Sequence, residues 1–180
     1  MRNKSVLYLT QAAMIAALYV VLTYLANALG LASQAIQVRF SEALTILPAF
    51  TGAAVPGLFI GCILANILTN CAPWDVVFGS IATLLGALGT YFIAHPTKAK
   101  RAAEEITAIG KRRWLLPLPP IVANTLIVPF VLAYVYRMEG TIPYFMLTVG
   151  IGEVISCYVL GLILFFGLYP IRHRLFGTQK

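Results

Sequence analysis

Apolar residues along the chain come in long runs that short polar clusters interrupt. A helix needs about 20 apolar residues to cross the hydrocarbon of a bilayer, and several runs approach or exceed that length. The runs, and the Gly and Pro residues between them, predict six helical segments: 6–29, 41–50, 53–68, 74–94, 114–136 and 142–169. We therefore predict an all-α polytopic membrane protein, a six-transmembrane-helix bundle in which residues 1–180 form one domain.

The segment 41–50 is too short to cross by itself, so 41–50 and 53–68 alternatively form a tight hairpin or a re-entrant pair. The distribution of basic residues along the chain favours the interpretation in which 41–50 and 53–68 each cross the membrane. With six crossings and a cytoplasmic N-terminus, only Arg39 and Arg137 lie outside, which satisfies the positive-inside rule. The remaining basic residues then lie inside: Arg2, Lys4, Lys98, Lys100, Arg101, Lys111, Arg112, Arg113, Arg172, Arg174 and Lys180. We expect both termini and the basic loop 95–113 in the cytoplasm of a bacterial cell.

Composition excludes a water-soluble globule, because 60% of the 180 residues are hydrophobic and 11% are charged. The net charge of +7 is explained by the loop charges, so it does not imply nucleic-acid binding. Cys62, Cys71 and Cys157 lack CxxC spacing, and we expect neither a disulfide nor a metal site. His95 and His173 lie at cytoplasmic helix ends, and no GxxxxGK[ST] motif is present. We expect no enzyme activity, no catalytic residue and no cofactor.

Ionisable groups inside membrane spans are costly, and Glu153 is the clearest example. It follows Thr141 by twelve positions, about 18 Å along a helix, which places it near the middle of the membrane. Asn124 reaches a similar depth on the preceding span. We expect this carboxylate and this amide to meet.

Other polar side chains cluster nearer the outer surface, and aromatic rings accompany them. This distribution predicts a solute-binding cavity open to the outside. Its candidate residues are Arg39, Glu42, Asn66, Asn70 and Asp75, with Trp74 and Tyr144 as stacking surfaces. Alternatively, the polar groups only join or cap helices, and the Trp residues belong to the interface belt.

The first span carries two stripes of small residues, Ala12 with Ala16 and Ala13 with Ala17. Such stripes allow close helix approach. They either pack inside this bundle or form a docking face for another membrane subunit.

Three segments carry a resemblance to a known family: VRFSEALTILPAF (38–50), GLFIGCILANIL (57–68) and PWDVVFGSIATLLGALGTY (73–91). They resemble the queuosine precursor transporter (QueT) family, within the substrate-binding S components of energy-coupling-factor (ECF) transporters. The resemblance implies a membrane subunit that binds a 7-deazaguanine and works with an ECF transmembrane coupling subunit and two ATPase subunits. It also implies that the alanine stripes, Ala12, Ala13, Ala16 and Ala17, contact the coupling subunit.

For such a ligand, Glu153 could accept hydrogen bonds from the N–H groups of a guanine-like edge, and Asn124 could donate to the neighbouring carbonyl. Glu42 or Asp75 could hold an aminomethyl cation. Three other functions remain open. The chain could be an S component for folate, thiamine or tryptophan, a solitary proton-coupled carrier, or a structural membrane subunit.

Overall fold

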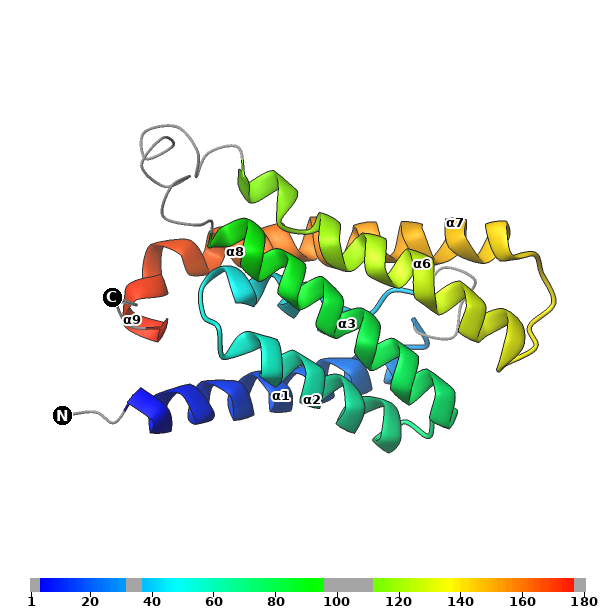
Figure 1. The fold of residues 1–180 in the computed structure, drawn as a ribbon, viewed down its shortest axis with the longest axis horizontal. Coiled ribbons are helices and arrows are strands. Elements are labelled where there is room, and N and C mark those ends of the chain that lie inside the picture. Colours follow the sequence, from blue (N-terminus) through cyan, green and yellow to red (C-terminus); the bar gives the residue numbers. More distant parts are fainter. Residues whose placement is uncertain (1–3, 32–36, 96–111, 177–180) are drawn as a thin grey trace.

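The computed structural model describes residues 4–31, 37–95 and 112–176 (Figure 1). Within these ranges all regular secondary structure is helical. The α-helices are α1 (Lys4–Ala28), α2 (Ala54–Leu68), α3 (Pro73–Ala94), α6 (Leu118–Tyr134), α7 (Ile142–Glu153), α8 (Gly161–Leu168) and α9 (Arg172–Phe176). The 3₁₀ segments are η1 (Phe40–Ala49), η2 (Arg113–Leu115) and η4 (Tyr169–Ile171), and η3 (Val154–Leu160) is a π-helix.

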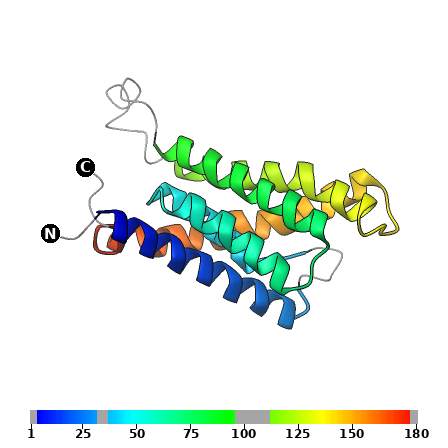
Figure 2. The same cartoon turned by 60° about the horizontal axis from the view of Figure 1, so that its bottom comes forward.

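Consecutive long segments run in alternate directions along the bundle (Figure 1). The start of α1, the start of α6 and helix α9 all lie at one end, which we call the basic end (Figures 1 and 2). The opposite end, where α3 begins and α6 ends, we call the cavity end. Arg39 and Arg137 lie there, whereas Arg112 and Arg113 lie at the basic end.

The count of six membrane crossings is not confirmed. Among the described residues, four helices are long and apolar enough to cross a membrane: Lys4–Ala28, Pro73–Ala94, Arg113–Tyr134 and Ile142–Ile171. The apolar helix α2 has 15 residues and η1 has 10. At about 1.5 Å and 2.0 Å per residue, each is shorter than a bilayer core. The basic loop was predicted over 95–113, and most of it, residues 96–111, lies outside the described residues.

The short segment η1 runs through the interior of the bundle. Every residue from Ser41 to Pro48 is buried, so η1 has no solvent-facing or lipid-facing side. Leu44 and Leu47 pack into a core cluster with Tyr19 of α1 and Leu58 of α2. Because the outer helices surround η1, any polar side chain on it must find its partners inside the protein.

Small residues bring α1 and α2 close together. A Cβ added to Gly57 would lie 2.7 Å from the Ala12 carbonyl oxygen, and one added to Gly61 would lie 2.9 Å from Ala16 Cα. Ala12 and Ala16 therefore pack within the bundle. Ala13 and Ala17 are exposed on the outer face of the same helix.

Candidate functional site

A cavity of about 340 Å³ opens at the cavity end of the bundle. This volume is near the lower limit of the roughly 300–1,000 Å³ typical of small-molecule sites. Most of the lining residues are of polar type, although apolar atoms supply most of the cavity surface: Thr23, Asn27, Gln37, Arg39, Asn66, Thr69, Cys71, Asp75, Leu132, Tyr136 and Met138. The lining residues come from α1, the 37–39 segment, α2, α3 and the end of α6, so the whole bundle shapes the site.

Asp75, in the first turn of α3, is the acidic residue of the cavity lining and is only 4% exposed. The Tyr136 hydroxyl donates to Asp75 Oδ2 at 2.9 Å and accepts from the Ala72 backbone N–H at 3.1 Å. Arg39 interacts electrostatically with Asp75. Tyr136 therefore holds the Asp75 carboxylate in place at the wall of the cavity.

The segment that carries Gln37 and Arg39 is fixed to the last long helix. The Arg39 backbone N–H donates to Ser156 Oγ at 3.1 Å. The Gln37 carbonyl lies so close to Gly152 that a Cβ at that position would be 2.1 Å from the Gln37 oxygen. A glycine is therefore required at 152 for this segment to lie where it lines the cavity.

Glu42 is the centre of a buried polar network deeper in the bundle. Its carboxylate accepts a short hydrogen bond from the Tyr19 hydroxyl. Thr83 Oγ1 donates to Oε1 at 3.5 Å, and Asn124 Nδ2 donates to Oε2 at 3.4 Å. The donors belong to α1, α3 and α6, so one carboxylate joins three helices through η1.

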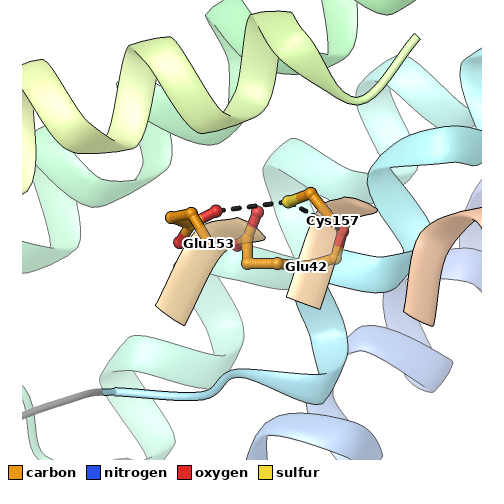
Figure 3. A group of neighbouring side chains, drawn as sticks. All are labelled: Glu42, Glu153 and Cys157. Carbon is orange, nitrogen blue, oxygen red and sulfur yellow. Dashed lines mark hydrogen bonds between the residues drawn. The ribbon is translucent and has the colours of Figure 1, made fainter. Parts of the chain in front are cut away.

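Glu153 and Cys157 lie against Glu42 on the last helix (Figure 3). The Cys157 thiol donates to Glu153 Oε2 at 3.2 Å and contacts the Glu42 carbonyl oxygen at 3.6 Å. One donor atom from each of the three residues lies within 4.8 Å of the others, a spacing that could hold a metal ion. The hydrogen bonds of the Cys157 thiol join these three residues. We call Glu42, Glu153 and Cys157 the carboxylate cluster.

Hydrogen bonds connect the cavity with the carboxylate cluster. Asn66 lines the cavity, and its amide donates to Cys62 Sγ at 3.6 Å. The Thr83 hydroxyl lies 3.5 Å from the same sulfur and 3.5 Å from Glu42 Oε1, so its one hydrogen can be donated to either acceptor. Arg39 interacts electrostatically with both Asp75 and Glu42. The two groups of polar residues are therefore parts of one site, with the cluster beneath the cavity.

The structure brings together six of the nine residues predicted to bind substrate. Arg39, Asn66 and Asp75 line the cavity, and Glu42, Asn124 and Glu153 meet below it. The other three lie apart from it. Asn70 is exposed in the turn after α2. Trp74 is 61% exposed and stacks on Phe78, and Tyr144 is 47% exposed. Neither ring lines the cavity, and both face outward because each follows a helix start at the membrane surface.

Sequence reasoning missed Tyr19, Cys157 and Tyr136. Tyr19 looked like an ordinary aromatic residue within the first apolar span. Tyr136 looked like an ordinary aromatic residue at the end of the fifth. Cys157 was considered as a disulfide or metal ligand and not as a partner of Glu153, although it follows Glu153 by four positions and so shares its helix face. That spacing was the available signal.

The model of the QueT transporter family matches residues 9–170, nearly the whole chain. The chain belongs to the QueT transporter family. No curated protein and no solved structure matches it. This QueT family member is thus a multi-pass membrane transporter protein, and its polar cavity is the candidate place for a transported solute.

Proposed function

We propose that this QueT family member is the substrate-binding membrane subunit of an ECF-type transporter and that it imports a 7-deazaguanine precursor of queuosine. The observation that carries the proposal is the cavity with Asp75 in its wall and the carboxylate cluster beneath it. The Asp75 carboxylate accepts hydrogen bonds and so suits a ligand rich in N–H donors, and the Arg39 guanidinium can donate to a carbonyl oxygen of the ligand. A guanine-like edge offers adjacent N–H groups, and an aminomethyl group adds a cation.

Charge distribution supports an orientation with the cavity end outside the cell. Arg112, Arg113, Arg172 and Arg174 lie at the basic end, which the positive-inside rule assigns to the cytoplasm. Under this orientation the cavity receives solute from the outside, and both termini are cytoplasmic.

The binding subunit needs a separate motor, because the chain has no P-loop motif. We propose that it is not an enzyme and that a coupling subunit with two ATPases drives uptake. The exposed Ala13 and Ala17 support a docking face on α1, since their small side chains leave the backbone accessible to another helix.

Purified protein should bind 7-deazaguanines more tightly than folate, thiamine or tryptophan. Isothermal titration in detergent, followed by competition between these compounds, measures the preference. Tighter binding of one of the other compounds would reassign the substrate within the transporter class.

Asp75→Asn should weaken binding of an aminomethyl 7-deazaguanine by roughly 10- to 100-fold, the size expected for a charge-assisted hydrogen bond. The asparagine oxygen still accepts from Tyr136, so the local fold is preserved. Glu139→Gln is the matched control, because Glu139 is exposed between α6 and α7 and does not line the cavity. Equal affinity of both variants and wild type would remove Asp75 from the site.

Ala13→Leu combined with Ala17→Leu should leave ligand binding unchanged and should stop most ATP-dependent uptake by cells that contain the coupling module, because the larger side chains prevent close helix approach. Ala13→Ser with Ala17→Ser keeps the volume small and is the control. Normal uptake by the leucine variant would mean that these residues face lipid only.

The buried pair of Glu42 and Glu153 favours one rival function, a solitary carrier that couples solute uptake to proton movement without ATPase subunits. Reconstitution into liposomes without ATPases distinguishes the two. Uptake driven by a pH gradient alone supports the carrier, and uptake only with the coupling module and ATP supports the binding subunit.

A further inference from the structure

Arg113, at the basic end, has no counter-charge within the described part of the protein. Its guanidinium carbon lies 5.2 Å from the centroid of the Phe166 ring and 5.8 Å from that of Trp114. Its Nε is covered by protein and has no hydrogen-bond acceptor. The side chain is nevertheless only partly buried, so the terminal nitrogens of the guanidinium are the part that can meet a ligand.

Arg172 is the other described arginine at the basic end that stacks on an aromatic ring, and its contacts differ from those of Arg113. Arg172 lies 3.9 Å from the Tyr169 ring centroid and donates from Nη1 to the Tyr169 carbonyl at 2.6 Å. Arg113 Nε has no such acceptor, and the exposed outer end of the guanidinium is able to meet an acceptor from outside the described residues.

An exposed aromatic strip leads from Arg113 along the side of the bundle. Trp114 and Phe166 are 45% and 44% exposed, although they pack edge to face against each other. Trp114 also stacks on Tyr158, with 6.4 Å between ring centroids. Tyr158 precedes Phe166 by eight positions on the same helix, about 12 Å toward the membrane centre. The strip is therefore apolar along its length and cationic at the membrane surface.

The described carboxyl groups all lie away from this end. Glu42 and Glu153 are in the interior, Asp75 lines the cavity, and Glu139 follows α6 at the cavity end. An anionic phospholipid presents a phosphate next to apolar acyl chains, and arginine binds phosphate through its planar donors.

We propose that Arg113, held between Trp114 and Phe166, binds the phosphate of an anionic phospholipid, whose acyl chain lies along the strip from Trp114 to Tyr158. This site is independent of the cavity and of the transported solute. It would fix the start of α6 at the cytoplasmic membrane surface.

Native mass spectrometry of the full chain in a neutral detergent tests the site by titration with phosphatidylglycerol. We expect Arg113→Gln to weaken phosphatidylglycerol binding by roughly fivefold or more. Arg174→Gln is the matched control, because Arg174 is exposed at the same end and its replacement removes the same charge. It should bind as wild type does. Phosphatidylcholine should bind more weakly than phosphatidylglycerol, and millimolar inorganic phosphate should not displace the lipid.

Three results would overturn the proposal: equal weakening by both variants, no retained lipid on wild type, or displacement by inorganic phosphate. The first would indicate diffuse attraction, and the last would indicate a site for a soluble anion. If Arg113→Gln does not accumulate, Arg113→Lys keeps the charge but loses the planar group. Weaker retention by the lysine variant supports the site, and unchanged retention contradicts it.

Discussion

Replacing Gly152 with alanine should weaken ligand binding by roughly ten- to a hundredfold, although residue 152 does not line the cavity. The new Cβ would lie 2.1 Å from the Gln37 oxygen and 2.9 Å from the Gln37 carbonyl carbon, so the backbone at residue 37 must move. That backbone leads directly to Arg39, and both residues line the cavity. Overpacking of this kind costs about 1–3 kcal/mol of folding free energy when the backbone keeps its place. Ligand binding that needs residues 37 and 39 in their original places must supply this free energy, which reduces the affinity by roughly the stated factor.

Gly150→Ala is the matched control for this experiment, since it makes the same substitution two residues earlier on α7. Its Cβ would lie 3.5 Å from Thr125 Oγ1, an ordinary contact distance, so binding should stay near the wild-type value. Titration of both variants with an aminomethyl 7-deazaguanine measures the difference. If Gly152→Ala does not fold, Ser156→Ala provides a second test. It removes the hydrogen bond that Ser156 Oγ accepts from the Arg39 backbone N–H, and it should weaken ligand binding a few-fold. Wild-type binding by Ser156→Ala and Gly152→Ala alike would show that the 37–39 segment does not shape the ligand site.

The sequence identified the charged centre of the site because charge in an apolar span has few explanations. Glu153 and Asn124 were placed at similar depth from the helix rise alone, and both lie at the carboxylate cluster. Glu42, which accepts a hydrogen bond from Asn124, was predicted near the outer surface. It lies deeper because η1 runs through the interior of the bundle, where Glu42 is fully surrounded by protein.

Local helix type could not be predicted from the apolar runs. When consecutive helical elements are joined, as in Arg113–Tyr134 and Ile142–Ile171, the observed segments begin and end within two residues of the predicted ones. Nothing in the hydropathy, however, distinguishes a 3₁₀ segment at 40–49 or a π-helix at 154–160 from an ordinary α-helix. Both irregular segments adjoin the carboxylate cluster, where the backbone follows the tertiary hydrogen bonds of Glu42 and Cys157 rather than residue propensity.

The alanine stripes show a second limit of sequence reasoning. Periodicity places Ala12 and Ala16 on one stripe and Ala13 and Ala17 on the next, but it cannot say which stripe meets a partner. The glycines of α2 decide this for Ala12 and Ala16, because only glycine allows their backbones to approach so closely. The docking prediction then depends on the exposed Ala13 and Ala17.

The second large effect should come from Glu42→Leu, which should lower the free energy of unfolding by about 2–5 kcal/mol. Leucine fills a similar volume but accepts no hydrogen bond, so the Tyr19 hydroxyl and the Asn124 amide each lose their acceptor in a buried site. Thermal or denaturant unfolding in detergent measures the loss. Glu139→Leu, which removes an exposed carboxylate, should leave stability near the wild-type value.

A double-mutant cycle with Tyr19→Phe separates the hydrogen bond from simple repacking. Tyr19→Phe should destabilise wild type, because it removes a donor to Glu42. In the Glu42→Leu background it should cost less or even stabilise, since it removes a hydroxyl that has no acceptor left. The expected coupling is about 0.5–3 kcal/mol, the range for residues in direct contact. Additive effects would contradict the network, because they would mean that Tyr19 and Glu42 contribute to stability independently of each other.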